Sequence, residues 1–267
     1  MHPELFRIGP FAIHSYGIML ALSFILGIFI AGKNGEKRGI KGDEIVNIGF
    51  IIIIASIVGA RLFYVLFHTE EFQNRWLYAF WPVQEDGTVG LGGLILLGGF
   101  LMALFSAVVY MYLKKLNFWK FSDSIAPSIA LGVFLTRIGC YLNGCCFGES
   151  CDLPWAVVFP NYSPAGAVMG EIPIHPTQLY SAFYGFLIFG LLQWLGQKPN
   201  FDGLLIGLFL ILYGISRFFV DFYRYYESQM FLIDGLQFNQ IVSLGLFISG
   251  FIILIYRWKS AEKSVPN

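Results

Sequence analysis

The sequence predicts an all-α polytopic membrane protein with about seven transmembrane helices, because it combines high hydrophobicity, few charges and several long apolar stretches. Of its 267 residues, 57% are hydrophobic and 13% are charged, whereas roughly a quarter of the residues in soluble domains are charged. A bilayer core of roughly 30 Å needs about 20 apolar residues per helix. The formal net charge is zero, so nothing in the composition indicates nucleic acid as a partner.

The apolar stretches define seven predicted spans. They cover residues 11–32, 45–67, 91–113, 123–142, 178–196, 203–224 and 237–257. No repeat or shift in composition divides the chain, so we expect a single integral membrane domain over 1–267, with an outer loop at 143–177. The connection at 68–90 carries Trp76 and Trp81, which favours a segment lying at the membrane interface.

The basic residues orient these spans. Alternate connections and the C-terminal tail carry 11 of the 17 Lys and Arg residues. These are Lys33, Lys37, Arg38, Lys41, Lys114, Lys115, Lys120, Lys198, Arg257, Lys259 and Lys263. The opposite connections carry only Arg7 and Arg75. Basic connections stay in the cytoplasm, so seven spans predict an outer N-terminus and a cytoplasmic C-terminus.

Four arginines remain within the spans, each towards the outer end: Arg61, Arg137, Arg217 and Arg224. A guanidinium in a bilayer is costly unless it is paired or hydrated. Snorkelling to the interface is one explanation, but Lys would snorkel equally well and none occurs there. Planar, bidentate recognition of phosphate favours Arg. We therefore predict an anion-binding cavity in the outer half of the bilayer, where a phospholipid headgroup is the nearest anion.

Two further features accompany the arginines. Asp221 lies four residues after Arg217, on the same helix face, which favours a salt bridge over a role for Asp221 as proton acceptor. Gly98 and Gly99 open the third span, where small residues permit close helix packing and also allow a ligand to approach the backbone.

The cysteines fall in one stretch: Cys140, Cys145, Cys146 and Cys151. Their spacing is not a usual zinc pattern, and it contains no C-x-x-C redox pair. A disulfide is permitted outside the cytoplasm. We interpret the cysteines as structural or inert, with a disulfide and a metal or redox role as the alternatives. His175 ends the outer loop at the mouth of the predicted cavity, where both a structural and a functional role fit.

The run T-R-I-G-C-Y-L-N-G-C-C-F-G at 136–148 resembles the signature of the prolipoprotein diacylglyceryl transferases, approximately G-R-x-G-N-F-[apolar]-N-x-E-x-x-G. The matching positions are Arg137, Gly139, Leu142, Asn143 and Gly148. Similar runs recur in family order: H-S-Y-G at 14–17, G-A-R-L-F-Y at 59–64, H-P-T-Q-L-Y at 175–180 and Y-G-I-S-R-F at 213–218. Many members carry a His where this chain has Leu97.

The resemblance implies transfer of a diacylglyceryl group from phosphatidylglycerol to the lipobox cysteine of a preprolipoprotein, at the outer face of the bacterial inner membrane. It implies no cofactor or metal. The candidate catalytic residues are Arg137, Arg217, His175 and Tyr213, with His175 as the base. The candidate substrate-binding residues are Tyr16, Arg61, Gly98, Gly99, Asn143, Gly148, Gln178, Asp221 and Arg224. The alternatives are a membrane thiol-redox protein using the 140–151 cysteines and a non-catalytic phospholipid-binding or transport protein.

Overall fold

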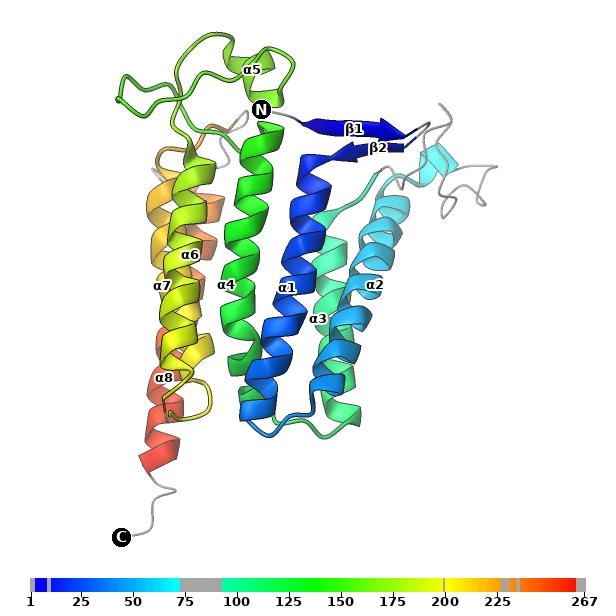
Figure 1. Ribbon diagram of the computed structural model, residues 1–267, viewed down its shortest axis with the longest axis vertical. Coiled ribbons are helices and arrows are strands. Elements are labelled where there is room, and N and C mark those ends of the chain that lie inside the picture. Colours follow the sequence, from blue (N-terminus) through cyan, green and yellow to red (C-terminus); the bar gives the residue numbers. More distant parts are fainter. Residues whose placement is uncertain are drawn as a thin grey trace.

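Seven long apolar helices run side by side in the computed structural model, and each is long enough to cross a membrane (Figure 1). The structure describes residues 3–8, 11–72, 93–198, 200–226, 231–233 and 236–262. The long helices are α1 (Ser15–Lys37), α2 (Gly42–Phe67), α3 (Leu96–Leu113), α4 (Phe118–Asn143), α6 (Thr177–Leu195), α7 (Leu204–Asp221) and α8 (Phe238–Glu262). Their ends agree with the predicted spans to within five residues, so the predicted fold class is confirmed.

The short elements lie near the ends of the long helices. They are the antiparallel pair β1 (Glu4–Ile8) and β2 (Phe11–His14), the 3-10 helix η1 (Thr69–Phe72), α5 (Pro164–Met169), and the antiparallel pair β3 (Phe231–Ile233) and β4 (Leu236–Gln237). The β1–β2 pair, α5 and the 143–177 loop lie at one end of the bundle, which we call the hairpin end (Figure 1). The predicted interfacial residues Trp76 and Trp81 lie outside the described residues.

The predicted alternation of the connections is seen in the bundle. The α1–α2 and α3–α4 connections and the last turns of α8 lie at the end opposite the hairpin end (Figure 1). We call this the basic end, because the lysine-rich connections are there.

Helix α1 lies between two groups of helices. It packs against α4 on one side and α2 on the other, while α2 pairs with α3 and α7 pairs with α8. The α2–α3 contact depends on glycine. A Cβ atom on Gly98 would meet the Phe63 ring, and one on Gly99 would lie 2.8 Å from the Ser56 carbonyl oxygen. These contacts assign both glycines to helix packing.

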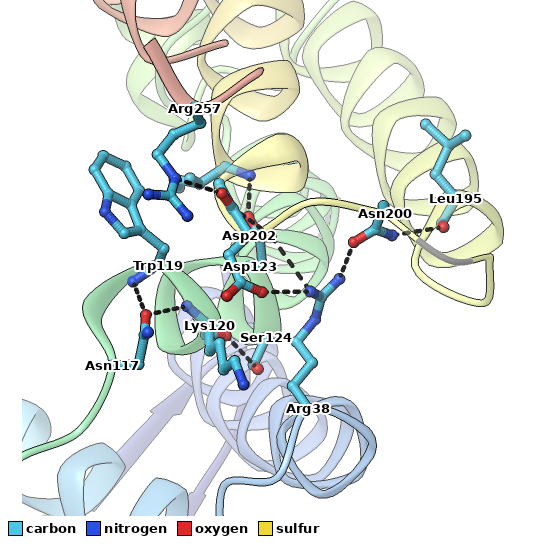
Figure 2. A network of polar contacts seen from close by, with 12 residues as sticks. Arg38, Asn117, Trp119, Lys120, Asp123, Ser124, Leu195, Asn200, Asp202 and Arg257 are labelled. Carbon is cyan, nitrogen blue, oxygen red and sulfur yellow. Dashed lines mark hydrogen bonds and ion pairs between the residues drawn. The ribbon is translucent and has the colours of Figure 1, made fainter. Parts of the chain in front are cut away.

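A buried carboxylate joins three segments at the basic end (Figure 2). Asp123 of α4 is fully buried. It accepts hydrogen bonds from the backbone N–H groups of Gly203 at 2.8 Å and Ile206 at 3.0 Å. The Arg38 guanidinium, just after α1, lies 3.4 Å from the same carboxylate and also donates to Asn200 at 3.1 Å. A buried charge with this many partners fixes the relative positions of α1, α4 and α7.

Neighbouring contacts extend this network to α8 (Figure 2). The Asn117 side chain caps α4 by accepting from the N–H groups of Trp119 and Lys120. Arg257 of α8 donates to the Asp202 carbonyl oxygen at 2.7 Å, and its guanidinium lies over the Trp119 ring. The basic end is therefore held by polar contacts, whereas the candidate site lies at the other end.

Candidate functional site

Arg217 is buried in α7 and is held by a carboxylate one turn further on. Its Nη2 atom lies 2.7 Å from Asp221 Oδ1. The Tyr226 hydroxyl donates to Asp221 at 2.6 Å and accepts from Arg217 at 3.1 Å, while Asn239 donates to the same hydroxyl at 3.0 Å. Burial and the bond to Asp221 raise the pKa of Tyr226, which keeps the hydroxyl a donor. The predicted salt bridge is confirmed, and it fixes the plane of the guanidinium.

Arg137 of α4 has a different environment. Its guanidinium interacts electrostatically with Tyr184, Tyr213, Cys140 and Cys146. No carboxylate pairs with Arg137 among the residues that the structure describes. A half-buried cation that faces hydroxyls and thiols keeps its charge available for an anion.

Tyr184 of α6 lies near both arginines and was missed by the sequence analysis. It interacts electrostatically with both Arg137 and Arg217. Its ring packs edge-on against Tyr213, with centroids 6.0 Å apart. The Tyr184 hydroxyl is buried and lies near Ser181, on the same helix. In the sequence, this tyrosine cannot be distinguished from a core aromatic residue of α6.

Arg224, just beyond α7, is a second cation without a carboxylate partner in the described ranges. Its guanidinium lies over the Tyr226 ring at 5.2 Å. The Arg224 Nε atom is buried and lacks a hydrogen-bond partner among the same residues. Its backbone pairs with Gly148 in an antiparallel bridge, which fixes it against the 143–177 loop.

Among the described residues, Arg61 contacts a different part of the bundle from the other three arginines. This residue lies on α2, which packs against α1 and α3. The Arg61 guanidinium donates to the Gly93 carbonyl oxygen at 3.3 Å and lies over the rings of Tyr64 and Phe72. These contacts place the Arg61 side chain beside the α2–α3 pair, and its role in substrate binding stays a prediction. Span positions show depth in the bilayer but not which helices pack together.

Gly148 lies where three segments meet. Its N–H donates to the His175 carbonyl oxygen at 3.1 Å, and the next residue, Glu149, donates to the Tyr223 carbonyl oxygen at 3.0 Å. A Cβ on Gly148 would lie 2.6 Å from both His175 and the Tyr223 oxygen. Glycine is therefore required at position 148 by the close approach of the backbone, and contact of Gly148 with a substrate stays a prediction.

The H-P-T-Q run holds the cysteine loop in place. Gln178 donates to the Cys145 carbonyl oxygen at 2.9 Å, and the Thr177 hydroxyl donates to the Cys146 carbonyl oxygen at 3.0 Å. Gln178 is fully buried, and its Oε1 atom has no partner within the described residues. The backbone contacts made by these two side chains orient the loop next to Arg137.

His175 lies at the rim of the hairpin end. Its Nδ1 atom is 3.2 Å from the Tyr180 hydroxyl, and its ring packs against Tyr223. Burial lowers the pKa of His175, and the nearby Glu149 offsets part of that shift. The side-chain contacts described for His175 are thus with the rim aromatics rather than with Arg137 or Arg217.

Three of the four cysteines come together, which their spacing did not indicate. The Sγ atoms of Cys140, Cys145 and Cys146 lie within 4.8 Å of one another. All four cysteines are free thiols, so the structure contains none of the disulfides considered above. Tyr16 of α1 interacts electrostatically with these three thiols and with Arg137. Hydrogen bonds with the other two thiols, followed by the neighbouring Arg224 and Arg137, lower the pKa of Cys146.

Comparison with known proteins decides the family. The model of the prolipoprotein diacylglyceryl transferase family matches residues 3–256. The chain belongs to this family. It is 33% identical to the phosphatidylglycerol–prolipoprotein diacylglyceryl transferase of Mannheimia succiniciproducens, over 98% of this chain and 96% of that protein. The enzyme of the same name from Aliivibrio salmonicida is 34% identical, over 96% of this chain and 88% of that protein.

This member of the diacylglyceryl transferase family also contains an apolar cavity between α1, α2 and α4. The cavity has a volume of about 410 Å³ and is lined by side chains of α1, α2 and α4. It extends from Phe121, near the basic end, to Thr136, the neighbour of Arg137. A hydrocarbon chain fits such a lining, and it would leave a polar headgroup at the hairpin end.

Proposed function

We propose that this protein transfers the diacylglyceryl group of phosphatidylglycerol to the lipobox cysteine of preprolipoproteins, in the bacterial inner membrane. Its relatives carry the name of this activity. The observation that best supports the proposal is a pair of cations, Arg137 and Arg224, without carboxylate partners among the described residues. Gln178 Oε1 and Arg224 Nε are buried atoms without partners among the same residues, and an apolar cavity reaches Thr136, which precedes Arg137 in α4. A lipid phosphate complements these cations, and its acyl chain complements the cavity.

The proposed orientation follows from charge. The hairpin end faces the outside and the basic end faces the cytoplasm, because lysine-rich connections are retained on the cytoplasmic side. The chain acts as one integral domain over 1–267. Arg137, Arg217 and Arg224 then lie in the outer leaflet, where lipobox segments emerge from the membrane.

In the proposed reaction, the cysteine sulfur attacks the glyceryl carbon that carries the phosphate. A carbon–sulfur bond forms, the carbon–oxygen bond breaks, and glycerol phosphate leaves with the electron pair. Negative charge thus moves from the sulfur to the phosphate oxygen. Fixed guanidinium groups stabilise this developing charge in a site of low dielectric. They also favour the thiolate over the thiol.

We assign separate roles to the arginines. Arg137 and Arg224 supply net charge to the phosphate, since no carboxylate neutralises them within the described structure. Asp221 neutralises Arg217, so Arg217 contributes a fixed donor geometry. Tyr16, Asn143 and Tyr213 hydrogen-bond the glycerol headgroup, and His175 accepts the thiol proton directly or through water.

One experiment tests the proposal. Purified protein is incubated with phosphatidylglycerol and a lipobox peptide, and the peptide mass is measured. We expect a mass increase of one diacylglyceryl group, located on cysteine. A peptide with Ser in place of Cys and phosphatidylethanolamine as donor serve as controls. Lipid binding without any thioether product would favour the non-catalytic lipid-binding alternative, and oxidised peptide as the product would favour the redox alternative.

A further inference from the structure

The thiols of Cys140, Cys145 and Cys146 form a cluster that the proposed chemistry leaves unexplained. Their Sγ atoms lie within 4.8 Å of one another. Three thiolates around a zinc ion, with Zn–S bonds of about 2.3 Å, lie about 3.8 Å apart. The sulfurs are thus within about 1 Å of the spacing that such a site requires. Cys151 is not part of the cluster.

The backbone brings these thiols together in a defined way. Cys140 is on the last turn of α4, and Gly144, with φ of 76°, ends the helix in the left-handed conformation. This turn reverses the direction of the chain. As a result, the Cys145 N–H donates to the Cys140 carbonyl oxygen at 3.1 Å. Cys146 has φ of 60°, which is uncommon for a residue other than glycine.

Side chains at the start of α6 also hold the backbone of the cluster in place. Gln178 and Thr177 bind the carbonyl oxygens of Cys145 and Cys146. Side-chain contacts of this kind orient metal ligands and fix their positions. Cys140 is buried, whereas Cys145 and Cys146 are half-buried, so the cluster has an accessible side.

Positive charge near the cluster offsets the negative charge that a metal–thiolate site would carry. Three thiolates and a divalent cation carry a net charge of −1. Arg137 and Arg224 interact electrostatically with Cys146, and Arg137 also does so with Cys140. The same arginines are those that we assign to the lipid phosphate, so the cluster borders the proposed reaction site.

We propose that Cys140, Cys145 and Cys146 bind a thiophilic divalent cation of the zinc class, and that the acceptor thiol occupies its fourth coordination position. The second half of this inference rests on the proposed function. Zinc sites that act on substrates combine three protein ligands with one exchangeable position. A thiol that coordinates such an ion is deprotonated, which supplies thiol activation.

The step balances. The acceptor thiol displaces water from the fourth position and releases its proton to solvent or to His175. The bound sulfur then uses an electron pair to attack the glyceryl carbon, and the bond from that carbon to the phosphate oxygen breaks. The oxygen keeps the bonding electrons and leaves as glycerol phosphate. The thioether is a neutral, weak ligand, so it dissociates and water returns.

Co²⁺ is the probe for the first half of the inference. Protein purified under reducing conditions and treated with a chelator is titrated with Co²⁺, and sulfur-to-cobalt charge-transfer absorption is recorded. We expect one ion per chain. Zn²⁺ should lower the number of thiols that react with a disulfide reagent from the four free cysteines to one. The variants Cys145→Ser and Cys146→Ser should lose the absorption band, and the matched control Cys151→Ser should keep it.

A lipobox peptide tests the second half. Addition of the Cys peptide should shift the visible cobalt bands, and the Ser peptide should not. Absence of the charge-transfer band in reduced wild type, or its persistence in Cys145→Ser and Cys146→Ser, overturns the site. Identical spectra with both peptides overturn the role of the fourth position. Undiminished transfer by the chelated protein also overturns that role and leaves the proposed function intact, since transfer is measured separately by mass.

Discussion

The Asp221 carboxylate lies 2.7 Å from the Arg217 guanidinium, and the Tyr226 hydroxyl bonds to both groups. The three side chains fix the direction in which the remaining guanidinium N–H groups point. Arg217→Lys should therefore lower kcat/KM for transfer by at least about tenfold, because an ammonium cannot reproduce a planar fork. The mass assay with phosphatidylglycerol measures this. Near-normal turnover by the lysine variant would show that charge alone suffices at this position.

Arg137 and Arg61 form a matched pair for testing the site. Arg137→Ala should reduce transfer by about a hundredfold or more, the effect typical of removing a donor that stabilises transition-state charge. Arg61→Met should retain most of the turnover per folded molecule and lower the melting temperature, because Arg61 contacts Gly93 and the rings of α2 and η1. Equal losses of turnover in the two folded variants would contradict the separate assignments.

The pH profile tests His175. Burial lowers its pKa below the ordinary value, so the neutral, proton-accepting imidazole persists to lower pH. If His175 is the base, the acidic limb of kcat/KM should lie below about pH 6.5, and His175→Gln should abolish that limb along with much of the rate. A variant with unchanged profile and rate would remove His175 from the proton transfer.

Gly148→Ala should destabilise the protein by about 1–3 kcal/mol, the usual cost of overpacking. The added Cβ would lie 2.6 Å from both His175 and the Tyr223 carbonyl oxygen. Thermal unfolding in detergent measures the effect. Gly190→Ala is the matched control, since nothing lies within 4 Å of a Cβ there, and alanine favours the helix by up to about 1 kcal/mol. A stable Gly148→Ala protein would mean that the three-segment junction can relax.

We expect a substitution in the polar network at the basic end to lower the stability of the protein without lowering its transfer activity. Asp123→Ala would leave Arg38 and the N–H groups of Gly203 and Ile206 without their buried acceptor. We expect destabilisation of about 3 kcal/mol or more and a lower melting temperature. Turnover per folded molecule should stay close to that of wild type, since the substitution is at the opposite end from the arginines. A selective fall in kcat would instead couple the two ends.

Sequence reasoning found the parts of this molecule that depend on local patterns. Helix length follows from apolar runs, and the Arg217–Asp221 bridge follows from a spacing of one turn. The contacts of Arg61 with Gly93, Tyr64 and Phe72 depend on which helices pack together, and that is a property of the whole bundle. Tyr184 is polar only at its hydroxyl and lies in an apolar helix, so its pattern is that of a core residue.

The cysteine cluster shows the same limit. On a continuous helix, side chains five residues apart, such as those of Cys140 and Cys145, would point to different faces. The sulfurs meet because Gly144 ends α4 in the left-handed conformation and turns the chain back. Likewise, the sequence placed His175 at the mouth of the site, whereas its packing against Tyr180 and Tyr223 depends on how the outer loop folds.

The buried Asp123 also has a consequence for biogenesis. Its carboxylate enters the membrane with α4, but two of its partners, Gly203 and Ile206, belong to a segment that the ribosome makes about 80 residues later. During that interval, Arg38 is the partner already synthesised. A nascent chain that stops before Gly203 therefore exposes a half-satisfied acidic group near the cytoplasmic surface in the proposed orientation. The docking of α7 then supplies the two missing donors and completes the hydrogen bonding of this carboxylate.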